Sequence, residues 1–394
     1  MKITTPFYYK DFKCIAGACT DTCCAGWDVD VDEASYKYYK SVKGSFGKRL
    51  KSVMVKSEEG GCTFTLNNGR CPFLNDENLC DLYIALGEEN LCDTCAEFPR
   101  FINEYGNTRE IGIAPSCITA GEIIFNYKDK LVFENTENYE FPKTYNDIDP
   151  LTYIQLTSAR KMAYSIVQNR AYTINDRCVL LLEFAKKIQK HLDSERDELI
   201  ANVVNAFKDM DYQQSVLDNA KKKYSGFDDT AYRYIYKYFD KFKGMEVINP
   251  DWFKVLEVNN EFMQDCDKNG MSDFFNKMYN EFDTYYEDRQ FEYEQLLVYY
   301  VYRYFLDAVY DYNLVLKIKN GIVGYLILKQ ADVAKWYING KQCGERKLSK
   351  AEQIDMAHLY SRQFEHSYSN FEVYTENFCK MRKYAYSNLL KILC

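Results

Sequence analysis

The stretch FEYEQLLVYYVYRYFLDAVYDY, residues 291–312, decides the kind of fold that this chain adopts. Its apolar residues recur at helical spacing, and its aromatic side chains make the apolar face wider than a surface helix needs. The pattern therefore predicts a central and largely buried helix, with a helical body built around it. The positions that share this face are Leu297, Val301, Phe305, Ala308 and Val309.

Helical patterns also dominate the sequence on both sides of this stretch. Residues 173–176 offer N-cap side chains before an amphipathic run, and residues 349–360 and 370–394 show the same period. The apolar run GIVGYLIL, residues 321–328, fits either a strand or a buried helix. We therefore expect residues 151–394 to form a tyrosine-rich α-helical body.

The first 133 residues follow a different pattern. Residues 1–121 hold 11 of the 18 glycines and four of the seven prolines, which favours short elements joined by turns. We expect residues 1–133 to form an irregular cysteine-rich module, with helices near 32–42 and 120–127, and residues 134–150 to form a polar linker. The predicted fold class is mainly α, with the irregular module packed on the helical body.

Composition and charge exclude several classes of protein. The chain of 394 residues is 47% hydrophobic and 27% charged, as soluble globular proteins are, and its net charge is −8. Nucleic-acid binding needs a cationic face, and the basic residues here are scattered. No apolar run is long enough for a transmembrane segment, and the first residues lack the apolar core of a signal peptide. We expect a cytoplasmic protein, and its oligomeric state stays open.

Ten of the 15 cysteines lie in the first 120 residues. In a reducing compartment, such clustering indicates metal binding or catalysis more than disulfides, although disulfides and inert buried thiols remain alternatives. The three histidines lie outside this region, so the site is thiolate-rich and suits an iron–sulfur cluster or zinc. The spacing of the cysteines does not decide which metal is bound. Their number exceeds what one four-ligand centre needs. The candidate ligands are Cys14, Cys19, Cys23, Cys24, Cys71, Cys80, Cys92, Cys95 and Cys117.

Three segments of this region resemble the flagellin lysine-N-methylase family. They are FKCIAGACTDTCCAGWDVDVD (residues 12–32), CPFLNDENLCDLYIALGEENLCDTCAEFPR (residues 71–100) and IGIAPSCITAGEI (residues 111–123). The resemblance implies a methyltransferase that uses S-adenosylmethionine and modifies lysine ε-amines of flagellin. It also implies a [4Fe–4S] cluster, with zinc as the alternative. The resemblance ranks Cys92 below the other ligand candidates, and Cys62 falls outside it.

The sequence assigns no catalytic residue. It also shows no glycine-rich loop after a strand, of the kind that cradles the adenosine end of the cofactor in Rossmann-type methyltransferases. Trp27 and Arg100 adjoin ligand cysteines and are the candidates for shaping the cofactor pocket, although packing of the module explains them equally well. We also expect tyrosines to line a channel that lowers the pKa of the substrate lysine. The alternative function is a non-catalytic zinc- or iron-binding module with a helical docking body.

Overall fold

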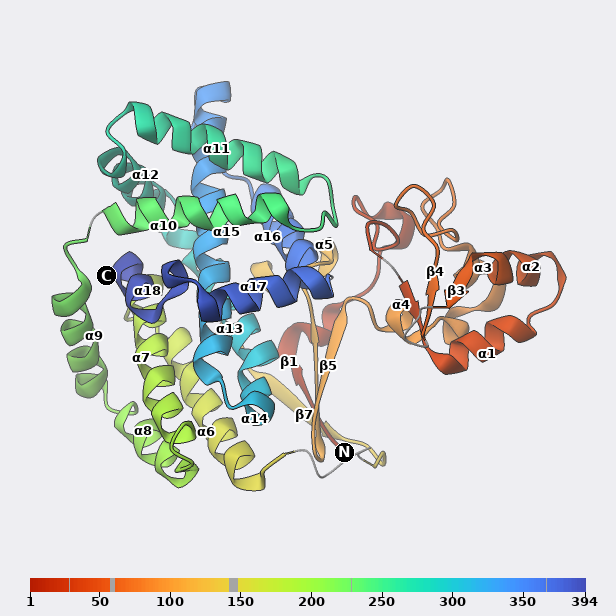
Figure 1. Cartoon of the computed structure of the whole chain (residues 1–394), viewed down its shortest axis with the longest axis horizontal. Helices are drawn as coiled ribbons and strands as arrows, with labels where there is room; N and C mark the ends of the chain where they lie inside the picture. The colour runs from red at the N-terminus through yellow and green to blue at the C-terminus, as the bar shows by residue number, and fades with distance from the viewer. Residues whose placement is uncertain (28, 57–60, 142–147, 228, 366) are drawn as a thin grey trace.

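Helix α15 (Leu314–Cys343) runs through the middle of the larger part of the molecule (Figure 1). The structure is a computed structural model that describes residues 1–27, 29–56, 61–141, 148–227, 229–365 and 367–394. Helices α7 (Ile174–Leu192), α11 (Trp252–Lys268) and α13 (Gln290–Tyr304) pack along α15. Most side chains of α15 are buried, so this helix is the axis of the main hydrophobic core.

Helices α13 and α15 approach closely because α15 has two glycines at their contact. A Cβ atom on Gly321 would lie 2.8 Å from Cβ of Tyr300, and a Cβ atom on Gly324 would lie 2.8 Å from the hydroxyl oxygen of Tyr300. Residues 291–304 are therefore confirmed as a central, buried helix, and a short helix α14 (Ala308–Asp311) follows it. The apolar run 321–328 belongs to α15, so it is a buried helix and not a strand.

The remaining helices surround these central ones. Helix α7 begins where the sequence predicts, because the Thr173 side chain accepts a hydrogen bond from the backbone N–H of Asp176. Within the described ranges, none of the helices is both long enough and apolar enough for a bilayer-spanning segment. The other helices of this body are α6 (Pro150–Val167), α8 (Ile200–Ala206), α9 (Met210–Tyr224), α10 (Asp229–Asp240), α12 (Ser272–Tyr285), α16 (Lys350–Glu365), α17 (Tyr368–Lys380) and α18 (Tyr386–Leu393).

A four-stranded sheet packs against this body in the order β5-β6-β1-β7. Its strands are β1 (Lys2–Pro6), β5 (Arg100–Tyr105), β6 (Thr108–Ile113) and β7 (Phe133–Glu137). Strand β1 pairs parallel with β6 and antiparallel with β7. Tyr302 of α13 donates a hydrogen bond to the backbone oxygen of Thr4 at 2.7 Å, which ties the sheet to the central helix. Helix α5 (Ile118–Asn126) follows the sheet and packs on α13 and α16.

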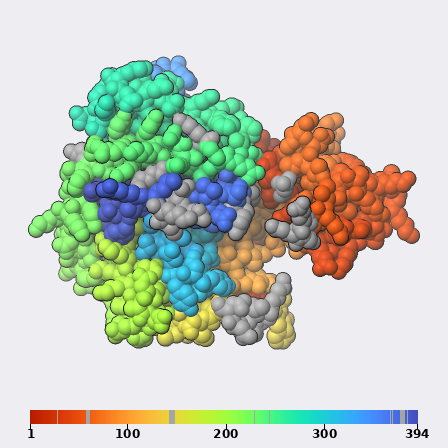
Figure 2. All heavy atoms as spheres, in the orientation of Figure 1, coloured from red at the N-terminus to blue at the C-terminus, as the bar shows by residue number. Residues whose placement is uncertain are grey.

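A smaller lobe projects from the body, on the right in Figures 1 and 2. It holds the antiparallel strands β2 (Val29–Val31), β4 (Cys62–Phe64) and β3 (Met54–Lys56), in that order. Its helices are α1 (Glu33–Ser41), α2 (Gly44–Val53), α3 (Asp81–Leu86) and α4 (Asp93–Glu97). Tyr39, Phe64 and Phe73 are among the residues of its separate core. We call this part, residues 14–97, the cysteine lobe.

The mainly helical fold is confirmed, but the first part of the chain is more regular than the sequence predicts. All seven strands of the described residues lie before residue 138, and each has only three to six residues, which is too short for a clear alternation. The helices expected near 32–42 and 120–127 are α1 and α5. Of the expected linker, residues 134–137 belong to β7 and residues 142–147 lie outside the described residues. The main core also takes in Tyr8 and residues between 101 and 131, so the first sheet packs with the helical body.

A buried ion pair joins the sheet to helix α6 and generates a prediction about stability. Arg160 of α6 donates to both carboxylate oxygens of Glu110 on β6, with the Nη1–Oε2 distance at 2.7 Å, and both residues are buried. The substitution Glu110→Gln leaves the buried guanidinium without its counter-charge, and we expect the free energy of unfolding to fall by about 3–5 kcal/mol. Denaturant titration followed by circular dichroism measures this change.

The control for this experiment is Arg233→Gln, which removes an exposed ion pair with Asp229 on α10. We expect that variant to lose about 0.5 kcal/mol or less. Equal losses in the two variants would contradict the claim that the Arg160–Glu110 pair is structurally important.

Candidate functional site

The first cysteine segment, residues 14–27, forms an irregular loop that is bound to the second cysteine segment through its backbone. The N–H of Cys71 donates to the carbonyl of Cys24 at 2.8 Å, and the N–H of Gly26 donates to the carbonyl of Gly69 at 2.8 Å. The indole N–H of Trp27 donates to the carbonyl of Cys23 at 2.7 Å. These bonds hold the adjacent Cys23 and Cys24 at the junction between the two segments.

The same loop is anchored to the helical body by the carboxylate of Asp21. It accepts hydrogen bonds from His358 Nε2 at 2.7 Å, Arg362 Nη1 at 2.9 Å and Asn249 Nδ2 at 2.7 Å. Both donors on α16, His358 and Arg362, are buried. Burial of Asp21 by itself raises its pKa, but the hydrogen bond from His358 and the charge of Arg362 outweigh burial and hold that pKa below its usual range.

Arg362 also fixes the loop backbone on either side of the adjacent cysteines. Its guanidinium donates to the carbonyl of Thr22 at 3.1 Å and to the carbonyl of Ala25. Gly26 lies so close to the body that a Cβ atom there would be 2.0 Å from the carbonyl oxygen of Ile248. The positions of Cys23 and Cys24 therefore depend on a helix that is more than 330 residues away in the sequence.

The nine predicted ligand cysteines fall into two groups whose members interact electrostatically. Burial raises the pKa of Cys19, Cys71, Cys80 and Cys117, and nearby sulfurs of the same group raise it further. The adjacent Cys23 and Cys24 connect the two groups, because their sulfur atoms are only 4.0 Å apart and each thiol acts on the pKa of the other. The first thiol group is Cys14, Cys19, Cys23 and Cys117, and the second thiol group is Cys24, Cys71, Cys80, Cys92 and Cys95.

Each thiol group contains enough sulfur for one four-cysteine site. The cysteines described in the structure are free thiols. In the described part of the chain, however, no three cysteine, histidine or acidic side chains converge in the way that ligands of a bound metal do. The ligand assignment stays a prediction, and so does its division into two sets.

The two side chains predicted to shape a cofactor pocket make packing contacts in this region. The Trp27 ring lies 6.0 Å from the ring of Phe98. Arg100 donates from Nε to the hydroxyl of Tyr9 at 3.0 Å, and its guanidinium lies 5.2 Å from the ring centre of Phe12. These contacts give Trp27 and Arg100 a structural role, and their role in cofactor binding stays a prediction.

Tyrosines of the central helix also make structural contacts. The hydroxyls of Tyr299 and Tyr304 both donate to the buried carboxylate of Glu365, with the Tyr299 bond at 2.8 Å. Arg303 lies 3.1 Å from the same carboxylate. The tyrosine-lined lysine channel stays a prediction, because these tyrosines belong to a satisfied polar cluster in the core.

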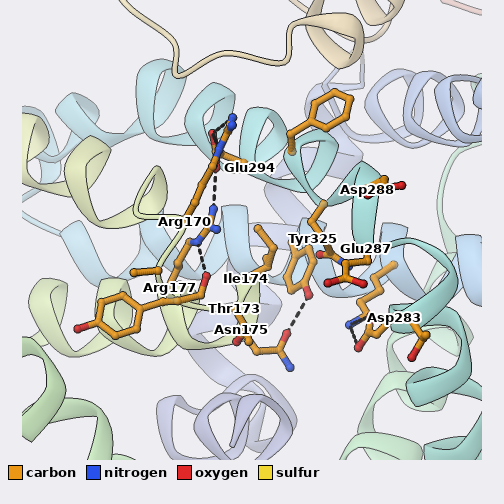
Figure 3. A pocket seen from close by; sticks show the side chains of 16 residues that line it. Arg170, Thr173, Ile174, Asn175, Arg177, Asp283, Glu287, Asp288, Glu294 and Tyr325 are labelled. Atoms are coloured by element: carbon orange, nitrogen blue, oxygen red, sulfur yellow. Dashed lines mark hydrogen bonds and ion pairs between the residues drawn. The ribbon is translucent and has the colours of Figure 1, made fainter.

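A cavity of about 820 Å³ opens in the helical body, between the start of α7, the end of α12 and the start of α13 (Figure 3). Glu294 is buried in its wall and is bound by Arg177 at 2.7 Å and by Arg170 at 2.9 Å. Lys329 of α15 donates to Asp283 at 2.9 Å, and the hydroxyl of Tyr325 donates to Asn175 at 2.8 Å. We call this the polar cavity.

The polar cavity was not predicted from the sequence, although two acidic residues in the stretch 291–312 indicate a polar site. Glu292 and Glu294 stand in a helix that the apolar pattern predicts to be buried, and both are less than 2% exposed. A buried carboxylate needs a partner, so these positions indicate a polar site. The partners Arg170 and Arg177 are more than 110 residues away, and only the fold identifies them.

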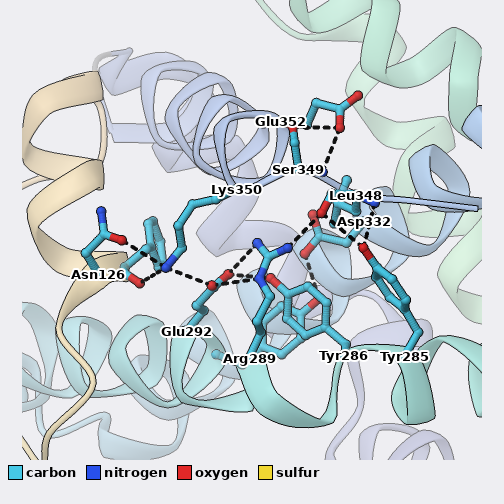
Figure 4. A network of polar contacts seen from close by, with 12 residues as sticks. Asn126, Tyr285, Tyr286, Arg289, Glu292, Asp332, Leu348, Ser349, Lys350 and Glu352 are labelled. Carbon is cyan, nitrogen blue, oxygen red and sulfur yellow. Dashed lines mark hydrogen bonds and ion pairs between the residues drawn. The ribbon is translucent and has the colours of Figure 1, made fainter.

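A network around Glu292 connects helix α13 to helix α5 (Figure 4). Glu292 binds Arg289 at 2.9 Å and Lys350 at 3.1 Å. Lys350, the first residue of α16, also donates to the carbonyl of Phe125 and to the side chain of Asn126, each at 3.0 Å. Because Cys117 immediately precedes α5, this helix joins the first thiol group to the region of the cavity.

Comparison with known proteins places this geometry in a family. Residues 160–393, more than half of the chain, match the family described as the FliB lysine N-methylase C-terminal domain. The chain belongs to the FliB lysine N-methylase family. The matched range contains the polar cavity and both α16 residues that bind Asp21, whereas the cysteine segments that resemble the family lie before it.

Individual relatives of this FliB-family chain come from Salmonella. Proteins named Lysine-N-methylase from Salmonella choleraesuis (strain SC-B67) and Salmonella typhimurium (strain LT2) are each 25% identical over 194 residues, 48% of this chain and 48% of theirs. The Flagellar biosynthetic protein FliU of Salmonella muenchen is 27% identical over 143 residues, 35% of this chain and 85% of that protein. The chain thus spans about half the length of the lysine-N-methylases that it matches. No solved structure matches the chain.

The anchoring of the cysteine loop generates a prediction with a matched pair of glycines. Gly26 and Gly69 both have positive φ, +85° and +75°, but only Gly26 lies against another segment. Gly26→Ala adds a clash with Ile248 to the backbone cost that both substitutions share. We expect Gly26→Ala to raise amide hydrogen exchange in residues 19–27 about tenfold or more.

Gly69→Ala is the control for the backbone cost, because nothing lies within 4 Å of its added Cβ atom. We expect little change in the same amides. Equal exchange in the two variants would show that the loop is not held against the helical body.

Proposed function

We propose that this protein is an S-adenosylmethionine-dependent methyltransferase that modifies lysine ε-amines of flagellin. The match of residues 160–393 to the FliB lysine N-methylase family carries this proposal. The name of the Salmonella muenchen relative, a flagellar biosynthetic protein, supports a flagellar substrate. The alternative, a metal-binding protein without catalysis, leaves the family match unexplained.

The proposed reaction sets chemical requirements on the protein. A lysine ε-amine has an unperturbed pKa of about 10.4, so it must lose a proton before its lone pair is available. The nitrogen lone pair then forms a bond to the methyl carbon, the carbon–sulfur bond of the sulfonium breaks, and S-adenosylhomocysteine leaves. The protein has to bring the amine and the sulfonium together in a site with little water, where burial lowers the pKa of the amine.

We further propose that the two thiol groups hold iron–sulfur clusters of the [4Fe–4S] type, with zinc as the alternative metal. The supporting observations are the number of sulfurs in each group and the free thiol state of the described cysteines. The surrounding fold suits this role, because backbone hydrogen bonds and Arg362 position the loop that carries Cys23 and Cys24. A bound cluster would contribute its binding free energy to the folding of the cysteine lobe.

The catalytic proposal is tested by methyl transfer. Protein purified without oxygen is incubated with flagellin and S-adenosylmethionine labelled in its methyl group. We expect label on flagellin lysines, located by mass spectrometry, because a lysine methylase transfers that group to the ε-amine. Flagellin that stays unlabelled, with intact folded protein, would favour the non-catalytic alternative.

The cluster proposal is tested by iron and sulfide analysis of two cysteine variants. Cys117→Ser removes a sulfur from the first thiol group, and Cys95→Ser removes one from the second. If each group holds its own cluster, we expect each variant to lose about half of the iron, since four cysteines hold one cluster.

Cys343→Ser, at an exposed position of α15, is the control and should keep its full iron content. Loss of all iron in both variants would indicate a single shared cluster. A folded, colourless preparation that contains only zinc would contradict the iron–sulfur proposal.

A further inference from the structure

We propose that the polar cavity binds the methyl donor, a sulfonium nucleoside that carries an amino-acid group. This inference rests on the proposed function, because it places the donor of that reaction at a site of this chain. The cavity is formed by residues between 170 and 329, all within the range that matches the FliB family.

The size and the walls of the cavity suit such a ligand. Its volume of about 820 Å³ lies within the range of cavities that hold small organic ligands and cofactors. Phe291 and Tyr172, both partly exposed, contribute aromatic surface to the lining, and the buried Tyr325 and Ile174 lie behind it. An adenine base can stack on such surface, while the polar part of the ligand meets the charged side chains.

The charges around the cavity match the charge of the donor. Three basic side chains, Arg170, Arg177 and Lys329, face four acidic ones, so the lining has a formal charge of −1. The donor carries a sulfonium, an ammonium and a carboxylate, and its net charge is +1. The product, which lacks the sulfonium, is neutral overall. The four acidic residues are Asp283, Glu287, Asp288 and Glu294.

The acidic side chains are not equivalent, and this identifies which of them are available to a ligand. Glu294 is bound by two arginines, and Asp283 is bound by Lys329. Glu287 and Asp288 are exposed at the turn between α12 and α13, and within the described ranges neither makes an ion pair. We assign the cationic groups of the donor to this pair of residues.

One basic side chain of the cavity, Arg170, has a free hydrogen-bond donor for the carboxylate of the ligand. Arg170 uses Nε and Nη2 to bind Glu294 and the carbonyl of Lys128, and Nη1 donates to no residue in the described part of the chain. The Arg170 side chain is 44% exposed, so solvent and ligands reach it. A guanidinium with a free edge is a common carboxylate ligand.

This assignment separates the donor from the thiol groups. Cys117 caps the beginning of α5, whereas Lys128, whose carbonyl binds Arg170, follows the end of that helix. A helix of nine residues is about 14 Å long, so the two sites are neighbours without sharing atoms. In this assignment the donor lies apart from Cys117.

The test compares binding of S-adenosylmethionine and S-adenosylhomocysteine to the full chain by isothermal titration calorimetry. The double variant Glu287→Gln/Asp288→Asn removes the free acidic pair and leaves the paired residues in place. We expect it to weaken binding of the positively charged donor about tenfold and binding of the neutral product less than threefold, because only the donor has the extra positive charge. Higher salt should reduce this difference.

A matched control, Glu195→Gln/Glu257→Gln, removes two exposed acidic charges outside the cavity and should leave both affinities unchanged. Unchanged donor binding in the Glu287→Gln/Asp288→Asn variant, with methyl transfer intact, would overturn the assignment and leave the proposed function standing. Weaker binding of a lysine-containing flagellin peptide, with donor binding unchanged, would also overturn it and would make the cavity a substrate site. A wild-type protein that neither binds the donor nor transfers methyl groups would contradict the proposed function itself.

Discussion

The buried contact between Asp21 and helix α16 is the interaction on which the arrangement of the cysteine lobe depends. A carboxylate that accepts from both a histidine and an arginine in a buried setting forms strong, directional bonds. Without that carboxylate, the buried donors His358 and Arg362 would lose their shared partner, at a cost in free energy. The contact therefore selects one position of the loop, and with it the directions in which Cys23 and Cys24 point.

Buried charge organises the helical body in the same way. Glu292 and Glu294 lie on the central helix α13, where an unpaired carboxylate would be costly. Basic side chains from α7, from α16 and from the segments that follow α6 and precede α13 pair with them. These pairs keep polar groups beside a core that is otherwise aromatic. Glu294 lines the polar cavity (Figure 3), and Glu292 is at the centre of a separate polar network (Figure 4).

Two helices connect this polar region to the cysteines. Helix α16 carries Lys350 at one end, where it binds Glu292, and Arg362 nearer the other end, where it binds Asp21. Helix α5 begins directly after Cys117 and ends at Asn126, which binds Lys350.

The sequence by itself determined the helical body, the central position of residues 291–304 and the beginning of α7 at Thr173, because these features depend on local periodicity and capping. It also identified the cysteine region, since its composition differs so strongly from the rest. Only the tertiary structure decided that Asp21 meets His358 and Arg362 and that Arg170 and Arg177 meet Glu294. These contacts join residues that are far apart in the chain, and neither spacing nor local propensity carries information about such pairs.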